Sequence, residues 1–140
     1  MASKMAMEIE STKQELLRRA RAIVGEFQLS EEGLSAGGVG AALITKGGNI
    51  YTGICLDFYC GIGFCAEHAA VAEMLKARET EIKMIVAVTD DAILPPCGRC
   101  RELMAQVNRN NFDTLIVLPG ERVATLRELL PEHWIIAGGQ

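Results

Sequence analysis

The fold of this 140-residue chain is decided by two stretches, Cys65-Ala66-Glu67-His68 and Pro95-Pro96-Cys97-Gly98-Arg99-Cys100. The apolar pattern that follows each stretch predicts a helix, over 65–78 and 97–108 respectively. A spacing of three residues places Cys97 and Cys100 on one side of a helical turn. Two predicted helix beginnings therefore carry three thiols that could share one site.

Outward from these stretches, apolar periodicity and turn residues predict the other elements. A helix is expected over 11–24, where Ser11 and Thr12 start a capping-box pattern. A strand over 39–45, a glycine turn and a strand over 50–54 make a hairpin. Further elements are predicted in the second half of the chain, namely strands over 84–89 and 114–118 and a short helix over 125–130. A hairpin followed by helix–strand alternation predicts an α/β protein with a mixed sheet and helices on its faces.

Length and composition indicate one compact domain over 1–140, because 49% of the residues are hydrophobic and can form a core. We expect residues 1–10 to be a flexible tail. No apolar run is long enough for a membrane-spanning helix, so no membrane partner is expected. The start of the chain lacks the layout of a signal peptide, which predicts a cytoplasmic protein whose cysteines stay reduced.

The charge of the chain argues against nucleic acid as a partner. The formal net charge is −4, and no basic run or stripe is present. Binding to a phosphate backbone normally needs clustered Lys and Arg side chains. We therefore expect a small-molecule substrate and no nucleic-acid partner.

The three thiols at the two helix beginnings form a candidate metal site. Helix N-termini carry partial positive charge and favour the thiolate form of cysteine. A catalytic zinc site keeps three protein ligands and leaves a fourth position for water, which Cys65, Cys97 and Cys100 would allow. Taken alone, Cys97 and Cys100 also fit a redox pair or half of a structural zinc site.

Glu67 lies on the apolar face of its predicted helix, beside Ala70, Val71 and Met74. A buried carboxylate costs several kcal/mol unless it is paired or neutralised, so this residue needs a function. Beside a zinc-bound water, Glu67 can take up a proton and pass it to a substrate. Zinc lowers the pKa of such a water to about 7.

These residues resemble the signature of the zinc cytidine deaminase superfamily, in which a Cys-x-Glu motif precedes a Pro-Cys-x-x-Cys motif. The sequence 39-VGAAL-43 is similar to the first core strand of that family, and 129-LLP-131 is similar to a tail motif of its nucleoside and blasticidin S branch. The resemblance covers the chain from the first helix to Trp134. It implies a cytidine-deaminase-like three-layer fold, with a mixed sheet of about five strands and helices on both faces.

The resemblance also implies a reaction. One Zn²⁺ per subunit, held by the three cysteines, would present hydroxide to C4 of a free cytosine nucleoside or nucleoside analogue. Glu67 would protonate N3 and then the leaving ammonia. Homotetramers are usual in the family, so a homotetramer or homodimer is expected.

Further site residues follow from the family pattern. Cys55 and Asp57 stand where the family has an Asn-x-Glu motif that holds the ribose, and Ala66 and Trp134 are expected beside the substrate. Family members with three cysteines often have Arg after the catalytic Glu, where it bonds the thiolates. Here that position is His68, so Arg101 or Arg99 would supply the compensating charge.

Two departures leave the substrate open. Gly37 replaces an aromatic residue that stacks on the pyrimidine, and Cys55 is a poor hydrogen-bonding partner compared with Asn. Blasticidin S or another modified cytosine nucleoside is therefore an alternative to cytidine. An alternative of a different class is a non-catalytic zinc-stabilised binding module, against which the inward carboxylate of Glu67 argues.

Overall fold

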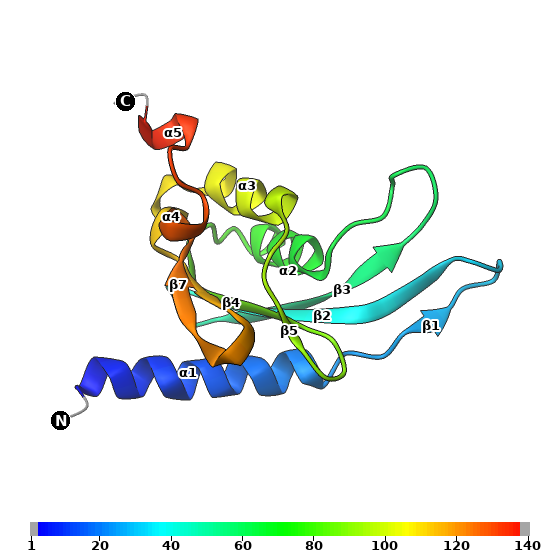
Figure 1. The fold of residues 1–140 in the computed structure, drawn as a ribbon, viewed down its shortest axis with the longest axis horizontal. Helices are drawn as coiled ribbons and strands as arrows, with labels where there is room; N and C mark the ends of the chain where they lie inside the picture. Colours follow the sequence, from blue (N-terminus) through cyan, green and yellow to red (C-terminus); the bar gives the residue numbers. More distant parts are fainter. Residues whose placement is uncertain (1–2, 138–140) are drawn as a thin grey trace.

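The computed structural model describes residues 3–137 and has three layers (Figure 1). Helix α1 (Lys4–Arg21) covers one face of a central sheet, and helices α2 (Ala66–Lys76) and α3 (Gly98–Val107) cover the other. The predicted α/β class with helices on both faces is therefore confirmed. No described helix is both long and apolar enough to cross a membrane.

Within residues 3–137 the sheet has seven strands, where about five were predicted. Its main body runs in the order β3-β2-β4-β6-β7, and β1 and β5 lengthen it beside β2 and β4. Among the described strands, only β4 and β6 pair in parallel, so the sheet is mixed, as expected. The strands are β1 (Phe27–Gln28), β2 (Ser35–Thr45), β3 (Ile50–Asp57), β4 (Ile82–Val88), β5 (Ile93–Leu94), β6 (Leu115–Val117) and β7 (Val123–Thr125).

The first helix begins at Lys4, inside the segment that was expected to be a tail. The Ser3 hydroxyl accepts a hydrogen bond from the Ala6 N–H (3.0 Å) and caps the helix. The side chains of Met5 and Met7 are exposed, so this first part of α1 lacks the apolar stripe by which a helix is detected in a sequence. Residues 1–2 of the expected tail lie outside the described residues.

The core lies on the two faces of the sheet. On one face, Leu16 and Leu17 of α1 pack with Ala42 and Met84. On the other, Ala41 and Leu43 belong to a larger cluster with side chains of α2 and α3, including Ala70, Met74 and Met104. Neighbouring residues of β2 thus point to opposite layers, as the period of two in a strand requires.

Helix α2 lies unusually close to the sheet at Gly53 of β3. A Cβ atom built on Gly53 would be 2.5 Å from both Ala69 Cβ and Ala70 N, and 2.7 Å from Ala66 O. Small residues on both elements permit this approach. The contact fixes the first turn of α2 over the middle of β3, and with it the position of Cys65.

The chain ends in short elements that the sequence pattern did not reveal in full. Helix α4 (Leu126–Leu129) falls within the predicted helix over 125–130 and is capped by Thr125 and Glu128. Helix α5 (Trp134–Ala137) follows it. Single 3₁₀ turns at Arg109–Asp113 and Pro119–Glu121 flank β6.

Candidate metal centre and active site

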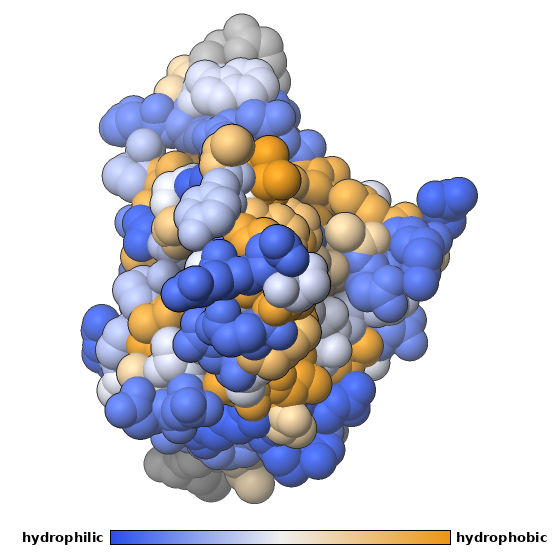
Figure 2. Space-filling model, turned by 90° about the vertical axis from the view of Figure 1, so that its right-hand side faces the viewer, coloured by the Kyte–Doolittle hydropathy of each residue, from blue (hydrophilic) through white to orange (hydrophobic). Residues whose placement is uncertain are grey.

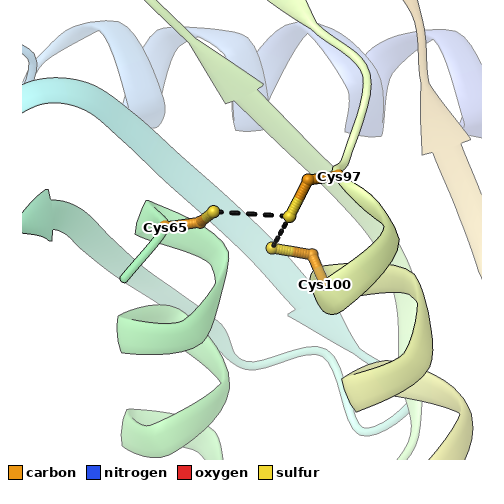
Figure 3. Close-up of side chains that lie close together, drawn as sticks. All are labelled: Cys65, Cys97 and Cys100. Carbon is orange, nitrogen blue, oxygen red and sulfur yellow. Dashed lines mark hydrogen bonds between the residues drawn. The ribbon is translucent and has the colours of Figure 1, made fainter. Parts of the chain in front are cut away.

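The three predicted ligand cysteines meet between the beginnings of α2 and α3 (Figure 3). Cys65 is the N-cap of α2, Cys97 is the N-cap of α3, and Cys100 lies in the first turn of α3. The Sγ atom of Cys97 is 3.5 Å from that of Cys65 and 3.5 Å from that of Cys100. All three sulfur atoms lie within 4.8 Å of one another, so one ion can contact them all.

The environment of the thiols differs from one to the next. Burial raises the pKa of the Cys100 thiol far above its usual range, and the nearby Glu67 carboxylate adds to this. Burial likewise raises the pKa of Cys65, as does the hydrogen bond with Cys97. Burial acts in the same direction on Cys97, but backbone N–H groups of Cys100 and Arg99, together with the two other thiols, outweigh it and lower the pKa of Cys97.

These features fit a zinc ion. Three thiolates at van der Waals distance repel one another, and a cation among them removes the cost of ionising the two thiols whose pKa is raised. Soft thiolate ligands suit zinc, and three protein ligands leave one position open for water. The two helix beginnings also place partial positive charge beside the negative sulfur atoms.

Glu67 lies in the first turn of α2 and is only 5% exposed. Burial raises the pKa of its carboxyl group, while its own backbone N–H and the Cys100 thiol act in the opposite direction. The side chain lines the same cavity as Cys65 and Cys97. A buried carboxyl group therefore shares the cavity with two of the three thiols that could hold a metal ion.

His68 and Arg101, which were expected to offset the charge of the thiolates, make different contacts: His68 approaches a thiol, and Arg101 does not. The His68 Nδ1 atom is 3.4 Å from Cys100 Sγ, and the imidazole stacks on Phe64. Burial lowers the pKa of His68, and the positive charge of Arg99 lowers it further. Arg101 instead donates hydrogen bonds to the carbonyl oxygens of Pro96 and Leu129, both at 2.9 Å. Arg101 thus ties the loop before Cys97 to the C-terminal part of the chain.

A cavity of about 620 Å³ opens beside Cys65 and Cys97. Of the residues expected to contact the substrate, Cys55, Asp57 and Ala66 line it. Trp134 does not: its side chain is 65% exposed, and its indole N–H donates to Glu102. A role for Trp134 beside a substrate stays a prediction, and it would require the cavity of a neighbouring subunit.

Several cavity residues were not found by sequence reasoning, among them Glu26, Phe58 and Phe64. Phe64 directly precedes Cys65, so its position next to the motif was a usable signal. Glu26 and Phe58 carried no such signal, because strand pairing and the path of the loop after β3 bring them to the site. Figure 2 looks at the side of the molecule that bears this loop, where hydrophobic and hydrophilic surfaces adjoin.

Gly37 occupies a position where a side chain does not fit. Its φ angle is +89°, and a Cβ atom would lie 2.4 Å from the carbonyl oxygen of Gly25. The ring that the family places here is therefore absent for a steric reason. Phe58 and Phe64 are the aromatic residues that line the cavity.

Comparisons with known proteins agree with this geometry. The model of the cytidine and deoxycytidylate deaminase zinc-binding region matches residues 10–115. A blasticidin-S deaminase of Bacillus cereus is 34% identical over an alignment of 104 residues, and the match covers 66% of this chain and 74% of that protein. A protein described as a probable cytidine deaminase of Dictyostelium discoideum is 32% identical over an alignment of 98 residues, and the match covers 66% of this chain and 65% of that protein.

Solved structures show the same fold. A cytidine deaminase of Mycobacterium tuberculosis superposes with a TM-score of 0.72 at 26% identity, covering 86% of this chain and 95% of the other. A cytidine deaminase of Burkholderia pseudomallei gives a TM-score of 0.68 at 28% identity, covering 85% and 96%. The three-layer arrangement predicted from the motif is thus confirmed.

Proposed function

The chain belongs to the family of zinc-binding cytidine and deoxycytidylate deaminases, and on that basis we propose that it hydrolytically deaminates a free cytosine nucleoside or nucleoside analogue. The observation that carries this proposal is the cavity into which Cys65, Cys97 and Glu67 all open. Metal ligands, a buried carboxyl group and room for a pyrimidine lie together there. A purely structural zinc site would have no use for the carboxyl group.

A zinc ion held by Cys65, Cys97 and Cys100 would supply the Lewis acidity that lowers the pKa of a water molecule to about 7. Glu67 performs the proton transfers: its carboxylate takes a proton from the attacking water and delivers it to N3 of the cytosine ring. After water has added at C4, the carboxylate takes a second proton, from the new C4 hydroxyl group, and transfers it to the departing amino group; the C4–N bond breaks, ammonia leaves and C4 becomes a carbonyl carbon. The product is the corresponding uracil compound. General acid–base catalysis of this kind contributes about 10²- to 10⁴-fold.

The cavity walls supply groups that could hold the ring and its substituent. Phe58 and Phe64 offer apolar surface to a planar base. The Val39 N–H donates to Cys55 Sγ (3.3 Å), and the Cys55 thiol lies 3.7 Å from an Asp57 carboxylate oxygen. Asp57 is thereby oriented as an acceptor for a polar group on the substrate.

A blasticidin S-type substrate is the favoured alternative to cytidine. The Bacillus cereus relative, 74% of whose length is covered by the match to this chain, is a blasticidin-S deaminase. The absence of a ring at Gly37 also removes a feature expected of cytidine-specific sites. Assembly as a homotetramer or homodimer is part of the proposal, and the exposed Trp134 at the end of the described chain is available for it.

The test is ammonia release by the zinc-loaded protein from cytidine, deoxycytidine, cytosine and blasticidin S, with Glu67→Gln as the inactive control. Activity on any of these compounds that disappears in the control is the expected result. If none of these compounds released ammonia although one zinc ion was bound per chain, a zinc-stabilised binding module would be favoured instead.

A further inference from the structure

Arg101 is a half-buried residue of α3 that directly follows Cys100 and is not among the residues that line the cavity. Its guanidinium group donates from Nε to the carbonyl oxygen of Pro96 and from Nη1 to the carbonyl oxygen of Leu129, both at 2.9 Å. Its backbone N–H donates to the carbonyl oxygen of Cys97 at 3.0 Å. One residue therefore bonds three carbonyl groups, two of them beside a metal-binding thiol and one at the end of α4.

The two peptide units on either side of Cys97 are both tied to Arg101. The Pro96 oxygen belongs to the peptide unit that leads into Cys97, and the Cys97 oxygen belongs to the one that leaves it. The rings of Pro95 and Pro96 fix their φ angles, and Pro95 is held extended because a proline follows it. The ψ rotation of Pro96 is then the freedom that remains directly before Cys97, and it swings the carbonyl group that Arg101 holds. Arg101 thus fixes the backbone that carries the Cys97 thiol.

The third carbonyl group comes from the 129-LLP-131 motif. Leu129 is the last residue of α4, and in a longer helix its oxygen would accept from the N–H four residues further on. Pro131 disfavours a helical conformation at Leu130, whose φ and ψ are −140° and 62°, so the helix ends there. An arginine side chain can bond the carbonyl groups that a helix leaves free at its end. The motif therefore provides the acceptor, and Arg101 provides the donor.

We propose that Arg101 is a positioning residue of the metal centre, which holds the Cys97 thiol where a zinc ion needs it and makes that position depend on the C-terminal part of the chain at Leu129. Cys97 is the thiol whose Sγ atom lies 3.5 Å from each of the two others, so a shift of Cys97 changes its distance to both of the other ligands. This inference rests on the metal site of the proposed function and is independent of which compound is deaminated.

A lysine at position 101 separates positioning from compensation of the thiolate charge, the role that the sequence led us to expect. Lysine keeps the positive charge, but its single ammonium group lacks the planar fork with which arginine reaches two carbonyl oxygens at once. Compensation of charge would survive Arg101→Lys, whereas positioning would be lost. Arg101→Met, which has neither the charge nor the donors, removes both roles.

Metal binding by the two variants is measured without a substrate. The Kd for zinc, from competition with a chelator, should rise about 10- to 100-fold in Arg101→Lys and in Arg101→Met, as is usual when a partner behind a metal ligand is lost. With cobalt(II) in place of zinc, the thiolate-to-metal charge-transfer absorption per bound ion should fall, because the Cys97 thiolate binds less well. Arg109→Lys is the matched control: Arg109 Nη2 donates to the carbonyl oxygen of Ile135 at 2.8 Å, also in the C-terminal part, and its side chain bonds neither peptide unit beside Cys97. It should leave the Kd and the cobalt spectrum unchanged.

The result for Arg101→Lys decides the question, and it does so even if Arg101→Met fails to fold. A Kd and a cobalt spectrum like those of the parent protein in Arg101→Lys overturn the positioning role and leave the proposed function standing. An equal rise of the Kd in Arg109→Lys also overturns it, because any loosening of the C-terminal part would then suffice. A parent protein that binds no zinc would instead defeat the proposed function, and this inference with it.

Discussion

Glu67 shows how burial gives a single residue a chemical role. Its carboxyl group is 5% exposed and stands beside three thiols, in a first helical turn that also holds Ala66. A side chain there that served only packing would be apolar, because burial of a carboxylate without a partner is costly. The buried position of Glu67 therefore supports the proton-transfer role that we propose for it.

The Glu67→Gln substitution tests this role without changing the shape of the side chain. We expect kcat to fall by about 10²- to 10⁴-fold, because the amide cannot accept and return the proton. Zinc content, measured by atomic absorption, should stay at one per chain, since Glu67 is not among the three ligands. Glu73→Gln on the same helix is the control, because Glu73 is exposed and pairs with Lys76. Retention of more than a tenth of kcat would contradict the assignment.

Gly37 provides a second test at the residue scale. Gly37→Ala should lower the free energy of unfolding by more than Gly48→Ala, measured in urea. The φ angles are nearly equal, at +89° and +91°, so both substitutions carry the roughly 1–2 kcal/mol cost of a left-handed alanine. Only at Gly37 does the added Cβ meet a backbone oxygen, at 2.4 Å, whereas the space around Gly48 is open. Equal decreases in the free energy of unfolding for the two variants would show that the backbone at residue 37 relieves the clash without further loss of stability.

At the scale of elements, the helix beginnings determine the site. Cys65 and Cys97 are N-caps of α2 and α3, so the distance between their sulfur atoms depends on how each helix sits on the sheet. Helix α2 packs on β3 at Gly53, where the helix leaves no room for a Cβ atom. Metal affinity is thus coupled to a packing contact on another element.

Gly53→Ala should therefore weaken zinc binding although residue 53 is not a ligand. The added Cβ would lie 2.5 Å from Ala70 N, so α2 must move and carry Cys65 with it. We expect at least a tenfold rise in the Kd for zinc, measured by competition with a chelator, and a lower Tm. Gly25→Ala, which meets open space, is the control. An unchanged Kd in Gly53→Ala would mean that the thiol geometry tolerates a shift of the helix.

The same scale shows what the sequence could predict. The two helices with cysteines at their beginnings, the hairpin of β2 and β3, and β4 and β6 were predicted within a few residues, because apolar periodicity and glycine turns mark them. Strands β1, β5 and β7 were not, because each has only two or three residues and forms through pairing with a neighbouring strand. For the same reason Glu26 was missed as a cavity residue, while the motif cysteines, which are close in sequence to their helix beginnings, were found.

At the scale of the whole molecule, the three thiols bring together two parts of the chain, one that ends with the hairpin and α2 and one that runs from β4 to the C-terminal elements. Cys65 follows the hairpin, whereas Cys97 and Cys100 follow β4 and β5 and lead toward the C-terminal elements. Arg101 extends this connection, since it bonds carbonyl oxygens both before Cys97 and at the end of α4. An ion on the thiols therefore links segments that are distant in the sequence, and its binding should stabilise the folded chain as a whole.

Removal of the metal should consequently lower the Tm of the entire domain. A ligand at about 1,000 times its Kd stabilises the native state by about 4 kcal/mol, which for a chain of this size corresponds to a Tm shift of about 10 °C. Calorimetry before and after chelation, and again after zinc is restored, measures the effect. Cys97→Ser should start at the lower Tm and respond to neither treatment, whereas Cys60→Ser should behave like the parent protein, because Cys60 is an exposed thiol outside the cluster. If chelation removed the zinc and left the Tm of the parent protein unchanged, the ion would not contribute to the stability of the fold. Protein contacts alone would then hold the hairpin and α2 to α3 and the C-terminal elements.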